Sequence, residues 1–551
     1  SDIILDSPTN NFCTLNPLDK VDSALTEGNL QATGAGNSFD TVRSTFAMTS
    51  GSWYAEFYCK AGSANGNNFV GISTQSEALS GISGSNFLGS SATSFGYSDN
   101  DNVYNSGNVA NNTGTTWTVG DIIGMTFTGT VLKFYKNNSL IATVSSIPVN
   151  DYCFTSTSYS TSMSMIANFG QDSSFASNKP PQFKRDLRNQ AEFYYEPPAG
   201  FLALCSNNLP EPAFIPSEYF NTVLWTGDGS EEVVTGVGFQ PDWIWVKARN
   251  AAVNHKVFDA VRGLGSLRPN TTGAEDTNTS ENLTSYDSDG FTMKDPDHIV
   301  DNRTVVAWNW KAGNATLASN AFTQGSIAST CSRNVEAGFS IVSYTGDSSG
   351  NATVGHGLSS PPEMIIQKCR SEDRNWLIWH TAFNDNDKAM LFNTDAVADN
   401  RFGPNAPTST VFGAFDGQGN RNNITAIAYA FHSVDGYSKV GSYTGNGVVD
   451  GTFVYTGFRP AWVMYKKAND AGNWGMLDNT RSPYNRTEAW LAANLANAET
   501  NQTAKSVDFL SNGFKPRGTP DANSDADLNT DGGTYIYIAF AEMPFSHSNA
   551  K

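Results

Sequence analysis

The chain has 551 residues, 12% of them aromatic and only 16% charged, with 49 glycines and a formal net charge of −19. This length predicts several domains, and the thinly spread negative charge argues against nucleic-acid binding, which needs clustered lysine and arginine, and against docking on anionic lipid. The sequence contains no run of eighteen apolar residues and no apolar segment after Ser1, so we expect no membrane-spanning helix and an export signal that is absent or already removed.

The first two hundred residues contain short segments typical of strands. In order they are SGSWYAEFYC (50–59), NFVGIST (68–74), SFGYSDNDNVYNSG (94–107), WTVGDIIGMTFTGTVLKFYKNNSLIAT (117–143) and MIANFGQ (165–171). In the fourth, a turn at Gly120-Asp121 precedes an apolar strand, Thr128-Gly129 makes a hairpin turn, and LKFYKN returns. We therefore expect a β-sandwich with Trp53 and Phe134 in its core.

This ordered set resembles a SPRY domain, in which a glycine-aspartate turn precedes an apolar strand and the return strand ends in F-Y-K-N. The resemblance covers about residues 11–205. It implies a bent β-sandwich that binds partners through loops at one end and carries no catalytic machinery.

Proline-rich stretches follow this region. Ser177–Pro198 is polar and locally basic, and Leu209–Phe220 is predicted to be stiff and extended. We expect residues 1–205 to form the first domain and residues 206–219 to form a linker.

The rest of the chain repeats itself three times. GFQPDWIWVKARN begins at Gly238, GFRPAWVMYKKAN at Gly457, and a fainter copy, GLSSPPEMIIQKCRS, at Gly357. An aromatic-Thr-Gly turn precedes each copy, six positions separate its proline from its lysine, and an asparagine follows seven positions later. The lysines and asparagines are Lys247 and Asn254, Lys368 and Asn375, and Lys466 and Asn473. We predict three domain-sized repeats at 220–335, 336–434 and 435–551.

Each repeat is expected to be an antiparallel β-sandwich, which makes the whole chain an all-β array of SPRY-like and concanavalin-like jelly rolls. The repeated segments are rich in tryptophan, valine and isoleucine and are bounded by glycine, proline and asparagine. The best helical pattern is EAWLAANLANAE at Glu488–Glu499. Trp243, Trp245 and Trp462 are expected in cores rather than as platforms for sugars. Met364 replaces the tryptophan in the middle copy, where GHGLSSPP also lengthens the turn.

Insertions that differ between the copies are the expected recognition loops, because loops vary while a framework persists. They are Arg262–Asn282, Asn384–Pro407 and Thr480–Thr503.

No catalytic motif is present. The sequence has no G-x-S-x-G, H-E-x-x-H or Walker pattern, and its six histidines are scattered. The six cysteines lie far apart and are expected to be buried free thiols. Asp527, Asn529, Asp531 and Gly532 match the opening of a calcium loop, but Ile538 stands where the bidentate glutamate belongs, so a polar hairpin loop is the favoured interpretation. We assign no catalytic, cofactor-binding or metal residue, and expect no cofactor.

The chain as a whole resembles tail-fibre or tail-associated structural proteins of marine tailed bacteriophages. The similar segments are SPTNNFCTLNPLD at the start, FYYEPPAGFLALCSNNLPEP at 193–212, and the YTGDGS-like and GFRPAWVMYK repeats. The resemblance implies a virion protein that binds a host surface glycan or protein. A capsid-decorating or other virion surface protein and, third, a polysaccharide depolymerase are the alternatives.

We expect a homo-oligomer, with a trimer favoured, that contacts other virion proteins and the host surface but neither nucleic acid nor the membrane interior. Its expected location is the virion, in a tail appendage.

Overall fold

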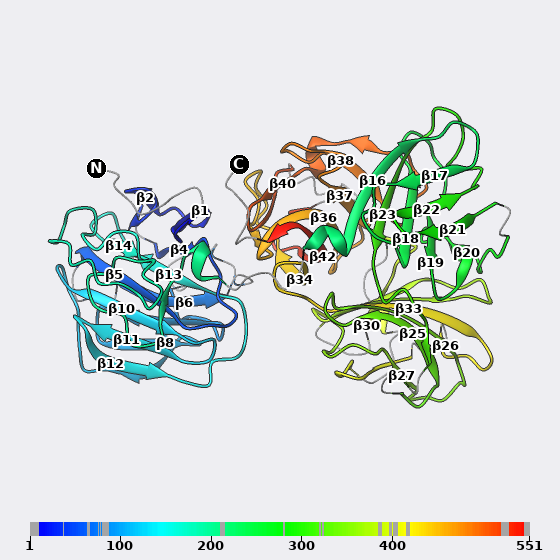
Figure 1. Ribbon diagram of the computed structural model, residues 1–551. Coiled ribbons are helices and arrows are strands. Elements are labelled where there is room, and N and C mark those ends of the chain that lie inside the picture. Colours follow the sequence, from blue (N-terminus) through cyan, green and yellow to red (C-terminus); the bar gives the residue numbers. More distant parts are fainter. Residues whose placement is uncertain are drawn as a thin grey trace. The chain divides into compact units, whose positions relative to one another are not determined.

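The computed structural model describes residues 10–36, 38–62, 65, 67–74, 77, 79, 87–209, 215–278, 281–318, 321, 324–383, 388–395, 399–400, 406–414, 419–518 and 528–544 (Figure 1). The chain forms two compact units, one built mainly from residues up to Glu211 and the other from Pro212 onward. Almost every regular element is a strand, which confirms the all-β prediction; the helical pieces of the described residues are short 3₁₀ turns, among them η1 (Ser206–Asn208), η2 (Pro216–Glu218) and η4 (Thr503–Lys505). None of the helices in the described ranges is long and apolar enough to cross a membrane.

The first unit is a sandwich of two antiparallel sheets. One sheet has the order β1-β4-β13-β6-β7-β8-β9 and the other β12-β11-β10-β5-β14-β3-β2, with β15 parallel to β5. The strands are β1 (Leu15–Lys20), β2 (Ala24–Thr26), β3 (Gln31–Thr33), β4 (Asp40–Ser44), β5 (Trp53–Ala61), β6 (Asn68–Thr74), β7 (Ser94–Ser98), β8 (Asn102–Asn105), β9 (Asn108–Asn112), β10 (Ile122–Phe127), β11 (Leu132–Lys136), β12 (Ser139–Val144), β13 (Tyr152–Ser158), β14 (Ser164–Asn168) and β15 (Leu202–Ala203).

The glycine-aspartate turn and the asparagine turn of this unit bind each other. Asn137, with φ +47°, accepts a hydrogen bond from the Ile122 amide (2.9 Å) and donates one to the Asp121 carboxylate (2.7 Å). The two turns therefore fix the ends of the β10–β11 hairpin, which explains why both occur at this spacing. Trp53 and Phe134 are buried, as predicted.

The stretch Ser177–Pro198 does not behave as a free connector, because its second half packs on the first unit. Phe193 is fully buried, and the amides of Tyr194 and Tyr195 donate to the carboxylate of Glu56 at 2.9 and 2.8 Å. Burial raises the pKa of Glu56 to about 7, although hydrogen bonds from both amides oppose the rise. The polar, proline-rich composition indicated a linker because it could not reveal this buried partner.

The second unit contains the three repeats, and their frames lie on equivalent strands (Figure 1). The main sheets have the orders β16-β23-β18-β19-β20, β26-β33-β28-β29-β30 and β34-β42-β36-β37-β38, extended in the middle repeat by β24, β25 and β31 and in the last by β39. Repeat 1 has β16 (Phe220–Thr226), β17 (Glu232–Thr235), β18 (Trp243–Ala248), β19 (Lys256–Asp259), β20 (Gly263–Leu267), β21 (Leu283–Asp287), β22 (Gly290–Met293) and β23 (Thr304–Trp310). Repeat 2 has β24 (Leu317–Ala318), β25 (Ser329–Asn334), β26 (Phe339–Thr345), β27 (Thr353–Gly355), β28 (Met364–Cys369), β29 (Leu377–His380), β30 (Lys388–Leu391), β31 (Asp399–Asn400), β32 (Val411–Gly413) and β33 (Thr425–Phe431). Repeat 3 has β34 (Ser438–Thr444), β35 (Val454–Tyr455), β36 (Phe458–Lys467), β37 (Gly475–Asp478), β38 (Ala489–Ala492), β39 (Thr500–Asn501), β40 (Val507–Leu510), β41 (Gly513–Pro516) and β42 (Thr534–Pro544).

The register is the same in each repeat. Trp243 pairs with Trp310, Met364 with Phe431, and Trp462 with Phe540. The domain boundary predicted at 335 falls after β25, which belongs to the sheet of repeat 2.

Each main sheet buries both of its faces. In repeat 1, one face packs on the small sheet β17-β22-β21, where Ile244 and Val246 meet Val234 and Phe291. The opposite face joins one core that the three repeats share, made by Phe220, Trp243, Trp245, Trp308, Trp310, Phe339, Ile341, Met364, Ile366, Tyr429, Phe431, Trp462, Met464, Ile536, Ile538 and Phe540 among others. The tryptophans are core residues, as predicted, but this core belongs to the whole unit and not to single repeats.

Side-chain hydrogen bonds close the repeats into a ring. Trp308 of repeat 1 donates to Asp478 of repeat 3 at 3.0 Å, and Tyr429 of repeat 2 donates to Asp259 of repeat 1 at 2.7 Å. His380 occupies the corresponding position of repeat 2, and its Nε2 lies 3.5 Å from a backbone oxygen of repeat 3. Every repeat therefore contacts both others in equivalent ways, which gives the unit pseudo-threefold symmetry.

The insertions Arg262–Asn282 and Thr480–Thr503 were expected to be recognition loops, and parts of both have a structural role instead. Arg481 binds Asp478 (2.5 Å) and Glu499 (3.0 Å), and Glu499 also pairs with Arg249 of repeat 1 at 2.7 Å. Arg262 makes the equivalent contacts with Asp259, with Glu275 and, through Glu275, with Arg370 of repeat 2. These insertions join neighbouring repeats. The sequence showed their variability but not that they form ion pairs with other repeats.

The lysine of each repeat is buried, and its ammonium group binds the backbone. Lys247, Lys368 and Lys466 each donate to two backbone carbonyls of nearby loops, at 2.7–3.1 Å. Burial lowers the pKa of each to about 8. This shared role explains why the motif keeps a charged residue inside an apolar strand.

The asparagine of each repeat accepts a hydrogen bond from a second asparagine further along the chain. The pairs are Asn254 with Asn270, Asn375 with Asn393, and Asn473 with Asn494. They hold the start of the second strand of each frame in place.

The helix predicted at Glu488–Glu499 is absent, because residues 489–492 form β38 and pair with β37. Leu491 is buried in the shared core. A sheet partner outweighs helix propensity here.

Candidate functional site

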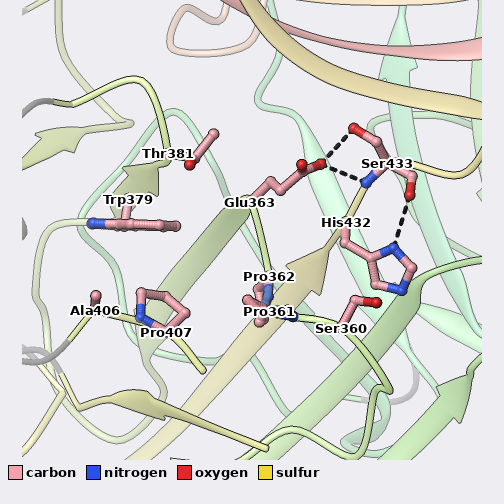
Figure 2. A pocket seen from close by; sticks show the side chains of 10 residues that line it. All are labelled: Ser360, Pro361, Pro362, Glu363, Trp379, Thr381, Ala406, Pro407, His432 and Ser433. Carbon is pink, nitrogen blue, oxygen red and sulfur yellow. Dashed lines mark hydrogen bonds between the residues drawn. The ribbon is translucent and has the colours of Figure 1, made fainter. Parts of the chain in front are cut away.

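A pocket of about 490 Å³ opens in repeat 2 (Figure 2). It lies between the turn that precedes β28, the end of β29 and the segment that follows β33. Its lining residues are Ser360, Pro361, Pro362, Glu363, Trp379, Thr381, Ala406, Pro407, His432 and Ser433.

The carboxylate of Glu363 is partly used by the fold. One oxygen, Oε2, accepts hydrogen bonds from the Ser433 amide (2.6 Å) and from the Ser433 hydroxyl. The equivalent residue of repeat 1, Asp242, accepts from the Ala312 amide at 2.7 Å in the same way. At both positions the acid binds the backbone of the chain just after the closing strand of its repeat. The second oxygen of Glu363, Oε1, forms no hydrogen bond with the described residues.

His432 borders the pocket, but its ring nitrogens are not accessible to a ligand. Its Nδ1 lies 2.9 Å from the Ser433 carbonyl oxygen. Because a carbonyl only accepts, Nδ1 is the donor of this hydrogen bond. Nε2 is buried and has no partner among the described residues.

The apolar wall comes from Trp379 and the prolines. Trp379 pairs with Ile365 in the register that places Phe258 opposite Ile244 in repeat 1. Phe258 is fully buried, whereas Trp379 keeps 5% of its surface exposed and borders the pocket. Figure 2 shows the indole edge-on, with Pro407 on one side of its plane and Thr381 on the other.

This arrangement suits binding. The pocket combines an apolar wall, the hydroxyls of Ser360 and Thr381, and the carboxylate oxygen Oε1 of Glu363 as an acceptor. A ligand rich in hydroxyl donors over an apolar face, such as a sugar ring, matches these groups. In the sequence, the only signal for this site was GHGLSSPP, which makes the turn before β28 longer in the middle repeat than in the other two.

A comparison with protein-family models matches residues 215–544 to the family described as "Domain of unknown function (DUF7483)". The chain belongs to this family. The matched region spans β16 to β42, so the DUF7483 region corresponds to the pseudo-threefold unit, and the pocket lies inside it.

A comparison of the DUF7483 chain with curated proteins finds no match. Among solved structures, it is similar to the SPRY domain of human HERC1 (16% identity, TM-score 0.25, 28% of this chain and 96% of that one) and to the TRIM65 PSpry domain (13%, 0.25, 28% and 89%). It is also similar to another human SPRY domain (17%, 0.22, 27% and 95%).

The remaining predicted site lies in a loop of the DUF7483 region. Of the calcium-like stretch, Asp527 lies outside the described residues. Asn529 is buried and bridges the turn after β34, accepting from the Asn446 amide (3.0 Å) and donating to the Val448 carbonyl (2.7 Å). Asn420 makes the same bridge in repeat 2, so Asn529 has a structural role.

Three further features of the sequence were possible sites: metal-binding clusters, the cysteines and the insertion Asn384–Pro407. In the described part of the chain, no group of three or more His, Cys, Asp or Glu residues could hold a metal ion. All six cysteines are buried free thiols, as predicted. Half of the insertion Asn384–Pro407 lies outside the described residues, and Ala406 and Pro407, which are described, line the pocket.

Proposed function

We propose that this chain is a structural and adhesive protein of a bacteriophage particle, in a tail appendage, and that it binds a host surface glycan without cleaving it. The phage assignment rests on the resemblance of the N-terminal segments and the repeats to tail-associated proteins. The observation that supports glycan binding is the pocket of repeat 2, where the carboxylate of Glu363 and hydroxyls stand beside an apolar wall.

The rest of the DUF7483 region is suited to hold the pocket rigidly. The repeats share one core, and partly buried ion pairs join repeat 1 to each of its neighbours. A ligand held in repeat 2 is therefore supported by all three repeats, since repeat 2 cannot move without disturbing that core.

Attachment assays test this proposal with a pair of matched variants. Thr381 is exposed at the pocket, and Asn479 holds the equivalent position in repeat 3. We expect the purified protein to compete with phage for attachment to host cells. Thr381→Arg should fill the pocket and weaken this competition at least about tenfold, whereas Asn479→Arg should not, and both should change the free energy of unfolding by less than about 0.5 kcal/mol.

The outcomes separate the two parts of the proposal. If the unmodified protein failed to compete at all, the adhesive function would be wrong. If the Thr381→Arg protein competed as well as the unmodified one, adhesion would lie elsewhere and the pocket would not be its site.

A further inference from the structure

A basic segment projects from the first unit, well away in sequence from the pocket. Residues 179–188 contain Lys179, Lys184, Arg185 and Arg188, which are four of the nine lysines and arginines among the first 211 residues. We call residues 179–188 the basic segment. It is an exception in a chain whose net charge is −19.

Two large apolar side chains stand beside these cations. Phe183 is 56% exposed and Leu187 is 77% exposed, while most of the neighbouring side chains are also exposed. Isolated apolar residues on a surface are ordinary, but an exposed phenylalanine beside two arginines matches the composition of protein–protein contact sites.

The basic segment is held firmly, and this distinguishes it from a solvated tail. Asp186 points inward, is buried, and accepts from the Gln190 amide (2.8 Å), the Ala203 amide (3.1 Å) and the Asn208 side chain (2.7 Å). Lys184 and Phe193 exchange two backbone hydrogen bonds, of 2.9 and 2.6 Å. The outward side chains are therefore presented at fixed positions, which lowers the entropy lost when a partner binds.

Lys179 is used by the fold, because its Nζ lies 5.5 Å from the centre of the Tyr58 ring and 6.0 Å from that of Tyr194. The other three cations of the basic segment are little used. Arg185 lies 3.7 Å from Glu192 with 54% of its side chain exposed, a geometry that contributes little. Arg188 reaches the Asn207 carbonyl at 3.5 Å, at the limit of a hydrogen bond. The side chain of Lys184 forms no ion pair or hydrogen bond with the described residues.

We propose that the basic segment is a docking surface for a second copy of this chain. Its four cations and Asp186 give it a charge of +3, so the remaining 541 residues carry −19 − 3 = −22. The surface of another copy is therefore acidic on average and complementary to this segment. Charge complementarity guides the encounter, and Phe183 and Leu187 provide the apolar anchors.

The test measures the mass of the full chain by sedimentation over a range of protein concentrations. We expect association at low salt that weakens as salt screens the charges. Combined Lys184→Glu, Arg185→Glu and Arg188→Glu should raise the dissociation constant at least about tenfold. Phe183→Ser with Leu187→Ser should also weaken association, and its effect should persist at high salt.

A matched control comes from the exposed loop of repeat 3. Tyr484 is 84% exposed and Arg486 is exposed two residues later. Tyr484→Ser with Arg486→Glu should leave association unchanged. A monomer at every concentration, or charge-reversed and control proteins that associate equally, would overturn the proposal. A change in hydrodynamic radius at constant monomer mass would overturn it too, because the basic segment would then dock on its own chain. None of these results concerns the pocket, so a failure of the docking proposal can be distinguished from a failure of the proposed glycan binding.

Discussion

Replacing Trp243 by alanine should lower the free energy of unfolding of the second unit by about 3–5 kcal/mol, because it opens a cavity in the shared core. The indole stacks on Tyr429 of repeat 2, with ring centroids 4.5 Å apart and planes 22° apart, and contacts Trp310 at 4.4 Å. Phe339 and Phe431 of repeat 2 complete its surroundings. Chemical denaturation measures the loss.

Hydrogen exchange then shows where the loss is felt. Because the core is shared, Trp243→Ala should speed exchange in β28 and β33 of repeat 2 as well as in β18. Met364→Leu, at the equivalent position, preserves volume and should cost less than about 1.5 kcal/mol. Faster exchange confined to repeat 1 would show that the repeats have separate cores.

Replacing Arg481 by methionine should destabilise the second unit by a similar amount, about 3–5 kcal/mol, because it leaves a buried carboxylate without its cation. The guanidinium is buried between Asp478 and Glu499 and lies 5.3 Å from the centre of the Trp308 ring of repeat 1. Arg481→Lys should cost less than methionine, since it keeps the charge but loses the planar set of donors.

An exposed ion pair provides the control. Arg421 lies 2.7 Å from Glu372, and both side chains are more than a third exposed. Arg421→Met should therefore cost less than about 1 kcal/mol. Equal losses for Arg481→Met and Arg421→Met would contradict a joining role for the buried pair.

The fold was largely predictable because its signals are local. Turns at Gly120-Asp121 and before Trp243, and the fixed spacing from proline to lysine, marked the strands of both units. The composition of DWIWVKA, rich in tryptophan, valine and isoleucine, marked it as a strand. It could not show that one face meets two other repeats, because that contact joins residues far apart in the sequence.

The pocket could be predicted only in part, for a related reason. The extra residues before Pro362 indicated that repeat 2 departs from the others. Its lining was hidden, because Glu363 and His432 belong to segments about seventy residues apart that meet only when β28 and β33 pair. The same distance effect made Arg262–Asn282 look like a free loop, although Glu275 binds Arg370.

The central claim is that this protein binds a host surface glycan and does not cut it. Size-exclusion chromatography of host polysaccharide after prolonged incubation with the full chain tests both parts in one measurement. We predict that the protein elutes with the polymer and that the polymer keeps its original length. Shortened polymer, with cleavage lost on replacing one specific Asp or Glu, would contradict the account and identify a depolymerase.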